Sequence, residues 1–310
     1  MLRSLLAPCL LSLVLTAAAH AQGALVSADQ CAQQRLERCQ LAEGLEYHRI
    51  ESSDPAERVV HVLVADMSHP GLSVGLTEPD PSAGLQYRAM RLSTFLERTG
   101  ALAAINASYF LPFAGGSDGG DDYIPQEFAA AEVSGAVYVD GETVSPVDWE
   151  TDRRVEAIIC FEPGHAVLVA GQICPDGFAS GLSSGPHLIE NGEAKTPRQR
   201  PGQPEADPAV PGPGGPRTAI GLADNGTRLI MVVADGRQPG YSQGMNHAAL
   251  IELFQAYGAH DAMSLDGGGS STMGVRGETG PVIMNRPIHT RVPGRERPLG
   301  NHIAIFAVSE

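Results

Sequence analysis

Short runs of apolar and β-branched residues, separated by polar or glycine-containing segments, fill the chain from about residue 45 onward. On this pattern, residues 58–66 and 72–76 predict strands. Three dipeptides predict tight hairpin turns between further strands, because each suits the positive backbone angles that such turns require. They are Asp140-Gly141, Asn191-Gly192 and Asn225-Gly226.

Two segments predict helices that lead directly into strands. Residues 88–99 place leucine and phenylalanine on one helical face and stop at Gly100, before an apolar strand at 101–105. Residues 245–257 repeat this arrangement before a strand at 261–265. Many strands with a few inserted helices indicate an α+β fold with a mixed, largely antiparallel sheet, in a single main domain.

The beginning of the chain predicts export. Residues 1–21 combine a positive charge at Arg3, an apolar run and a small-x-small cleavage site, as in a signal peptide, and the alanine-rich signal favours a periplasmic or secreted protein. Residues 22–45 read as an N-terminal appendage and 46–310 as the main domain. Within it, residues 196–216 are rich in proline and glycine and predict a mobile surface loop.

Composition narrows the possible partners. The formal net charge of −15 argues against nucleic acid or an anionic membrane as the partner, and no later stretch is long and apolar enough for membrane insertion. The oligomeric state is not specified. Four cysteines follow the leader, and we expect disulfides Cys31–Cys39 and Cys160–Cys174, although four cysteines allow three pairings.

No histidine cluster or C-x-x-C pattern indicates a metal site, so the sequence requires no cofactor. The many carboxylates are compatible with a structural calcium ion.

The segment from Leu265 to Met273 carries the clearest chemical signal. An apolar run ends in Asp266, followed by Gly267, Gly268 and Gly269 and then by Ser270 and Ser271. Consecutive glycines leave backbone N–H groups free to converge on an anion, and the hydroxyls add donors. A phosphorylated or polyhydroxylated ligand fits this segment, and a plain glycine-rich surface turn is the alternative.

Further polar residues follow or begin predicted strands. Asn106 and Asp235 follow strands, Arg217 begins one, and Ser242 and Gly244 precede a helix. If neighbouring strands carry them, these residues converge at one sheet edge, where the planar guanidinium of Arg217 would hold a phosphate. Simpler roles stay open: a surface ion pair for Arg217, a helix N-cap for Ser242 and a turn at Asp235.

Five segments occur in the order seen in phosphodiester glycosidases, and the chain resembles this family from about residue 60 to 309. The segments are 104–110, 185–192, 217–221, 235–245 and 265–273. The resemblance implies hydrolysis of a diester that joins a sugar anomeric carbon to a second group through phosphate. It implies a site lined by Asn106, Arg217, Asp235, Ser242, Asp266 and residues 267–271.

This sequence departs from the family pattern in two places. Ala107 follows Asn106 where the family usually has glycine, and the proline-rich insert before Arg217 is longer than expected. Because the insert borders the expected site, the choice of substrate stays open.

The residues are consistent with one hypothesis for the reaction. Arg217 and the glycine amides hold the phosphate, and Asp235 or Asp266 acts as a base toward water or stabilises positive charge at the anomeric carbon. Ser242, Ser270 and Ser271 orient phosphate or sugar hydroxyls. The expected substrate is a phosphorylated saccharide of the envelope or an exopolysaccharide, and the alternative is a periplasmic module that binds such material without hydrolysing it.

Overall fold

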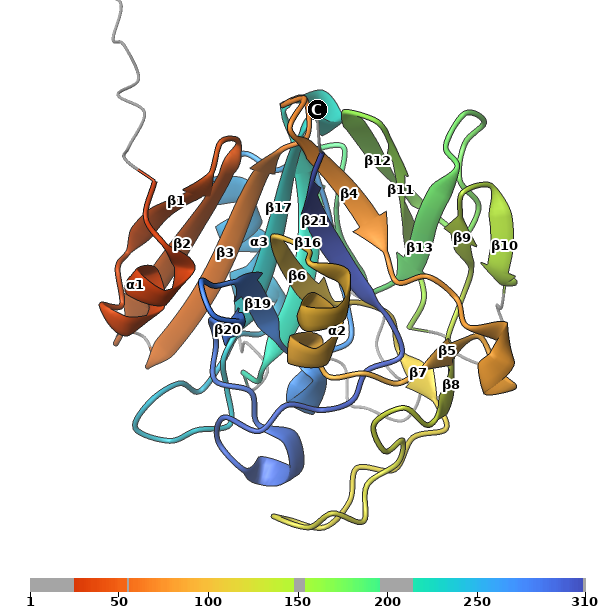
Figure 1. The fold of residues 1–310 in the computed structure, drawn as a ribbon. Helices are drawn as coiled ribbons and strands as arrows, with labels where there is room; N and C mark the ends of the chain where they lie inside the picture. Colours follow the sequence, from red (N-terminus) through yellow and green to blue (C-terminus); the bar gives the residue numbers. More distant parts are fainter. Residues whose placement is uncertain (1–24, 55, 148–153, 196–213, 309–310) are drawn as a thin grey trace, which may run out of the picture.

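A computed structural model describes residues 25–54, 56–147, 154–195 and 214–308 (Figure 1). The predicted signal peptide and most of the proline-rich segment lie outside these residues. The described residues form four sheets, and every ladder between their strands is antiparallel. The prediction of an antiparallel, strand-rich fold is confirmed, but the single mixed sheet is wrong.

The largest sheet has eight strands and carries the expected helix-to-strand segment near residue 261. In spatial order, its strands are β1 (Arg38–Ala42), β2 (Leu45–Ser52), β3 (Arg58–Asp66), β17 (Arg228–Ala234), β16 (Arg217–Ala223), β18 (Asp261–Ser264), β14 (His187–Glu190) and β15 (Glu193–Ala194). Its central strands are apolar at nearly every position because both faces of the sheet are covered.

Three smaller sheets complete the fold. One contains β10 (Glu142–Ser145), β9 (Val137–Val139), β13 (Ser180–Ser184), β11 (Ala157–Glu162) and β12 (His165–Ala170). Another contains β20 (Pro281–Ile283), β19 (Met273–Arg276), β6 (Ala103–Asn106), β21 (His302–Ala307) and β4 (Leu72–Leu76). The smallest contains β5 (Tyr87–Arg88), β8 (Ala130–Val133) and β7 (Phe110–Leu111).

Three α-helices and four 3-10 turns connect the strands of the described chain. The helices are α1 (Ala28–Gln33), α2 (Leu92–Thr99) and α3 (His247–Ala256). The 3-10 turns are Pro81–Ala83, Asp224–Gly226, Gly268–Ser270 and His289–Arg291. None of the helices in the described ranges is long and apolar enough to cross a membrane.

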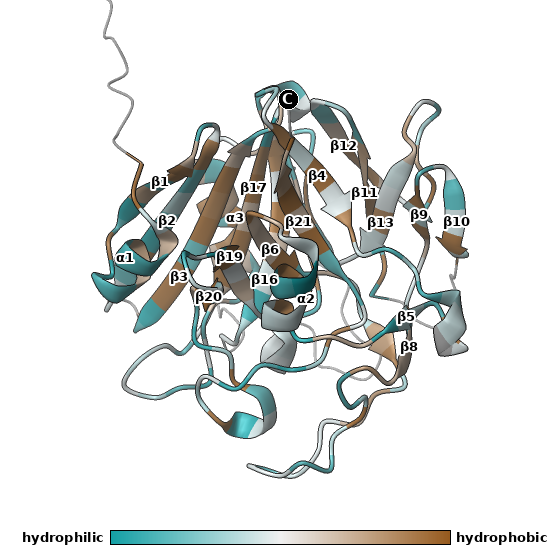
Figure 2. Cartoon of the chain, in the orientation of Figure 1, coloured by the Kyte–Doolittle hydropathy of each residue, from teal (hydrophilic) through white to brown (hydrophobic). Residues whose placement is uncertain are grey.

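Successive side chains of β17 point alternately into two layers of the core. Ile230 and Val232 pack with α3 on one face of the eight-stranded sheet, whereas Met231 and Val233 face the main core, which also contains residues of β6, β19 and β21. Helix α2 covers the far face of β6 and β21. In Figure 2 the hydrophobic colour follows the central strands, and the hydrophilic colour lies mostly on loops and outer segments.

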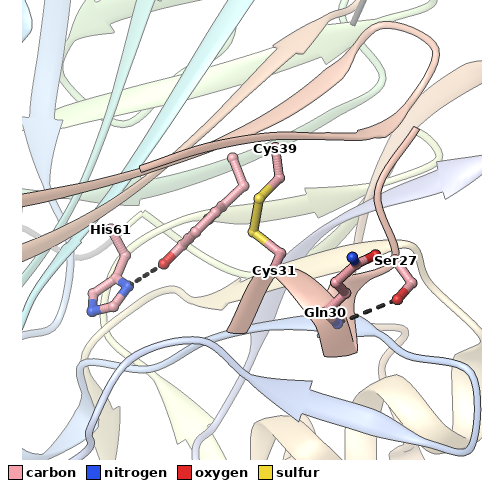
Figure 3. Close-up of a disulfide and its surroundings, with 6 residues drawn as sticks. Ser27, Gln30, Cys31, Cys39 and His61 are labelled. Carbon is pink, nitrogen blue, oxygen red and sulfur yellow. Dashed lines mark hydrogen bonds between the residues drawn. A yellow bond between two sulfur atoms is a disulfide. The ribbon is translucent and has the colours of Figure 1, made fainter. Parts of the chain in front are cut away.

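Both predicted disulfides are present. Cys31 and Cys39 join α1 to β1 with a Cα–Cα distance of 6.3 Å, and Figure 3 shows this bond with His61 of β3 nearby. Cys160 and Cys174 are joined over 5.8 Å. Two disulfides are consistent with an exported protein. From Leu25 on, the segment predicted as an appendage supplies α1 and the edge strand β1 of the eight-stranded sheet.

Candidate active site

The ends of three neighbouring strands meet at one edge of the eight-stranded sheet. Strand β16 runs antiparallel to both β17 and β18, so it begins where they end. Arg217 pairs with the last residue of β17, which Asp235 follows. The N–H of Leu265, immediately before Asp266, donates to the Thr218 carbonyl over 2.8 Å. The structure thus brings Arg217, Asp235 and Asp266 to one edge, as the sequence predicts.

Asn106 ends β6 in a different sheet and connects the two sheets at this edge. Its amide nitrogen donates to the carbonyl oxygen of Asp266 over 2.6 Å. Its amide oxygen accepts hydrogen bonds from the Thr218 hydroxyl at 2.6 Å and from the N–H of Thr272 at 3.1 Å. Because the side chain is buried and bonded at both ends, Asn106 positions the strand ends, and contact with substrate stays a prediction.

The glycine loop, residues 267–271, allows three arginine side chains to approach its backbone. Gly268 has a φ of +65°, a conformation that glycine adopts without strain. A Cβ atom placed on each glycine shows how close the nearest guanidinium nitrogens lie. The separations are 3.7 Å between Gly267 and Arg217, 3.1 Å between Gly268 and Arg237, and 2.6 Å between Gly269 and Arg297. Three positive groups therefore surround this loop in a chain of net charge −15.

Asp266 lies beside these positive charges, yet the pKa of its carboxyl group is raised. Burial raises the pKa of its carboxyl, and the Ser270 hydroxyl with the charges of Arg297 and Arg154 opposes this effect only in part. Burial likewise lowers the pKa of Arg297, with Asp266 acting in the opposite direction. A carboxylate with a raised pKa is a stronger base than a solvated one, which suits Asp266 for proton transfer.

His289 and Ser270 hold Arg297 in place. The Nε of Arg297 donates to Nδ1 of His289 over 3.1 Å, and its Nη1 donates to the Ser270 hydroxyl over 2.9 Å. Burial, with the nearby arginine charges, lowers the pKa of His289 to about 3. The ring is therefore neutral at physiological pH, so that Nδ1 accepts and Arg297 keeps its orientation.

Asp235 is a buried carboxylate with donors on both oxygens. Its Oδ1 accepts from the Asn285 amide at 3.0 Å and from the N–H of Arg286 at 2.9 Å. Its Oδ2 accepts from the Tyr241 hydroxyl at 2.9 Å and from Nε2 of His61 at 3.2 Å. Burial alone would raise the pKa of Asp235, but these hydrogen bonds and the His61 interaction lower it. Asp235 therefore has the environment of a positioning residue and not of a base.

We expect Asp235→Asn to lower the free energy of unfolding by about 3 kcal/mol at pH 7. The asparagine NH₂ group would replace an oxygen that accepts hydrogen bonds, so buried donors would be left without an acceptor. A lowered folded-state pKa contributes stability above the unfolded pKa that is lost as the pH falls through the folded value. Urea unfolding should therefore show the difference between wild type and variant narrowing at acidic pH. Asp224→Asn, in an exposed turn, should stay within about 0.5 kcal/mol of wild type, and an equally small effect at Asp235 would contradict the network.

Ser242 and Gly244 support the connection that follows Asp235. The buried Ser242 hydroxyl donates to the Asp235 carbonyl over 2.7 Å and accepts from the N–H of Val59 over 3.1 Å. It is not the helix cap, since Asn246 caps α3. A Cβ on Gly244 would lie 2.2 Å from the carbonyl oxygen of Gly215, so only glycine fits there. Substrate contact by either residue stays a prediction.

The two loop serines differ in their contacts. Ser270 accepts from Arg297, as described above, whereas the Ser271 hydroxyl is buried and makes no hydrogen bond to the described residues. Such an unsatisfied buried hydroxyl is unusual in a folded protein. Contact between the Ser271 hydroxyl and a ligand stays a prediction.

Sequence reasoning missed several residues that the fold brings to the site. They are Arg237, Arg297, His289, Asn285 and Tyr241. Arg237 could have been found, because it lies two residues after Asp235 in segment 235–245, which the sequence already indicates. Tyr241 lies in the same segment, and Arg297, His289 and Asn285 lie in segments without a recognisable pattern.

Gly269→Ala should reduce kcat/KM by about tenfold to a hundredfold, because the new methyl group would displace the Arg297 guanidinium. The backbone at Gly269 does not have a positive φ, so the variant should fold normally, as a thermal melt would show. In the double variant with Arg297→Gln, the loss should not exceed that of Arg297→Gln alone. Additive losses would mean that Gly269 acts independently of Arg297.

In the part of the chain that the structure describes, no three histidine, cysteine, aspartate or glutamate side chains gather as a metal site. A structural calcium ion held in another way stays a prediction.

Comparisons with known proteins agree with this geometry. The sequence profile of the phosphodiester glycosidase family matches residues 99–306, which include the strand ends and the glycine loop. A comparison with curated protein sequences finds no significant match.

Solved structures show the same fold at low sequence identity. The catalytic domain of zebrafish N-acetylglucosamine-1-phosphodiester alpha-N-acetylglucosaminidase, auto-inhibited by its pro-peptide, is 17% identical with a TM-score of 0.57, over 87% of this chain and 85% of that one. A hypothetical protein from Synechocystis is 15% identical with a TM-score of 0.57, and the match spans 87% of this chain but 63% of that protein. A putative exported protein from Burkholderia pseudomallei is 18% identical with a TM-score of 0.52, over 81% and 74% of the two chains.

The family match covers most of the chain and contains the residues that meet at the sheet edge. The chain therefore belongs to the phosphodiester glycosidase family and is a hydrolase of that class.

Proposed function

We propose that this protein is an exported hydrolase that cleaves sugar-1-phosphodiester linkages in envelope or exopolysaccharide material. The observation that supports this most strongly is the convergence of Arg217, Arg237 and Arg297 on the glycine loop. The chain has a large net negative charge, so a local group of arginines favours a bound anion that the overall charge would repel.

In the proposed mechanism, the guanidinium groups and the loop amides hold the phosphate of the diester. Water attacks the anomeric carbon and transfers a proton to the Asp266 carboxylate, while the bond from that carbon to the phosphate oxygen breaks. The electron pair of this bond leaves with the phosphate as a phosphomonoester dianion, whose added charge the arginines stabilise. Asp235 holds the connection that carries Arg237 and does not exchange a proton.

The roles of the remaining predicted residues follow from their contacts. Asn106 fixes the strand end that carries Asp266. Ser270 orients Arg297, and the Ser271 hydroxyl, which has no hydrogen-bond partner among the described residues, would donate to a sugar or phosphate oxygen. Ser242 and Gly244 hold the connection that begins at Asp235.

Incubation with UDP-N-acetylglucosamine, and with a glycan linked through N-acetylglucosamine phosphate, in ¹⁸O-labelled water tests the proposal. We expect free sugar that carries the label and an unlabelled phosphomonoester. Label in the phosphate would show cleavage of a phosphorus–oxygen bond and overturn the glycosidase mechanism. Binding without turnover across a broad panel of sugar-1-phosphodiesters would favour a carbohydrate-binding module.

A further inference from the structure

An exposed phenylalanine lies directly beside the arginine group of the site. Phe113 belongs to the loop that joins β7 to β8, and 48% of its surface is exposed. The guanidinium carbon of Arg297 lies 4.8 Å from the centre of its ring. Phe110, which is buried, meets the ring edge-on at 5.8 Å and supports it from the protein side. A supported aromatic ring with an open surface therefore adjoins a proposed phosphate-binding group.

The loop that carries Phe113 is attached to the segment that carries Arg297. The N–H of Gly119 donates to the Thr290 carbonyl over 2.7 Å, and Asp118 pairs with Arg291 over 3.1 Å. The rings of Tyr123 and His289 meet edge-on at 4.3 Å. Figure 1 shows this loop and the segment around the last 3-10 turn together at the lower end of the fold. These contacts fix the position of Phe113 relative to Arg297.

We propose that Phe113 is the platform on which the pyranose ring of the substrate stacks. The inference rests on the proposed function, because it requires a phosphate held by Arg297. In a sugar-1-phosphodiester, one oxygen separates the phosphorus from the sugar ring, so the ring must lie within a few ångströms of the guanidinium. The C–H face of a pyranose is apolar and carries partial positive charge, and it is attracted to the negative face of an aromatic ring.

The position of Arg297 also decides which part of the substrate reaches Phe113. Arg297 contacts Phe113 and Ser270, and its charge interacts with that of Asp266. The anomeric carbon must face Asp266, since that carboxylate accepts the proton of the attacking water. A sugar ring attached to that carbon therefore extends along Arg297 toward Phe113, and the second ester group extends elsewhere.

Kinetics of Phe113→Ala and Phe113→Trp with UDP-N-acetylglucosamine test the platform. Phe113→Ala should raise KM about tenfold with kcat changed less than about twofold, because stacking is lost while the reacting groups are unmoved. Phe113→Trp, which retains an aromatic face, should stay close to wild type. The inhibition constant of inorganic phosphate should be the same in all three proteins, since phosphate carries no sugar ring.

Phe128→Ala is the matched control. Phe128 is similarly exposed, at 43%, and also lies beneath an arginine, with the Arg98 guanidinium carbon at 5.6 Å, but Arg98 does not belong to the site. This variant should leave KM unchanged.

Two outcomes would overturn the platform while leaving the proposed function intact. An unchanged KM in Phe113→Ala would show that the ring does not contact substrate. An equal weakening of substrate and inorganic phosphate would show that Phe113 acts only by holding Arg297. Absence of turnover by the wild-type protein would instead overturn the proposed function, and the platform with it.

Discussion

Asp266→Asn is expected to lower kcat/KM by about a thousandfold while the protein remains folded. The asparagine side chain keeps nearly the same shape but cannot accept a proton from water. Initial rates with UDP-N-acetylglucosamine, together with circular dichroism of the folded variant, would measure this effect. Residual activity within tenfold of wild type would exclude Asp266 as the base.

The stability of Asp266→Asn provides a second, independent measurement. Burial raises the folded-state pKa of Asp266. A group of this kind contributes stability that is present below its unfolded pKa and is lost as the pH rises through the folded value. At pH 7 the wild-type protein therefore carries the cost of ionising a carboxyl group that the fold partly removes from water, and the variant should melt at an equal or higher temperature. A much lower melting temperature would indicate a structural role instead.

The pH dependence of the wild-type rate follows from the same carboxylate. Asp266 must be ionised to act as a base, so kcat/KM should fall as the pH drops through a pKa above the usual aspartate value of about 3.9. The residual kcat/KM of Asp266→Asn should not show this fall at acidic pH. A wild-type profile that is flat in the acidic range would argue against proton transfer to Asp266.

Local patterns predicted the strands and turns well. Strands β3 and β4 have the bounds that the apolar runs indicate, and Asn225-Gly226 joins β16 to β17 with positive φ at both residues. Helix α2 begins at Leu92 and not at 88, because Arg88 belongs to β5 and pairs with Ala130 of β8, and Met90 forms a bridge with Leu299. These are contacts between distant segments, which a local pattern does not contain.

The number of sheets could not be predicted for the same reason. Strands β6 and β18 follow similar helix-glycine-alanine segments, yet they lie in different sheets. Which strands pair depends on how the apolar faces pack in three dimensions, and runs of valine and isoleucine fit several arrangements. The boundary between these two sheets nevertheless forms part of the site, since the side chain of Asn106 in β6 donates a hydrogen bond across it to the carbonyl oxygen of Asp266.

The sequence identified the part of the site that lies within one motif or at one strand end. It could not separate the roles of Asp235 and Asp266, because the donors that surround Asp235 come from Asn285, Arg286 and His61, far away in the chain. Arg297 and its neighbour Phe113 were missed for a related reason. Arg297 and Phe113 lie in long loops whose mutual attachment is visible only in the fold.

Arg217→Gln is expected to lower kcat/KM by about a hundredfold to a thousandfold, because a permanent charge is removed from the group that holds the phosphate. Arg217→Lys should recover part of the activity, since lysine keeps the charge but not the planar fork. Arg228→Gln is the matched control: Arg228 lies in the same hairpin at the opposite edge of the sheet. It should not change kcat/KM more than about twofold.

A titration separates loss of the Arg217 charge from a general disturbance of the site. Burial, and next the charge of Arg217, lower the pKa of His247 to about 4. Removing the charge should therefore raise the His247 pKa in Arg217→Gln but not in Arg217→Lys or Arg228→Gln, as measured by NMR of the histidine ring. If Arg217→Gln were inactive with an unchanged His247 pKa, its guanidinium would lie away from the place described, and the arrangement of arginines around the glycine loop would have to be revised.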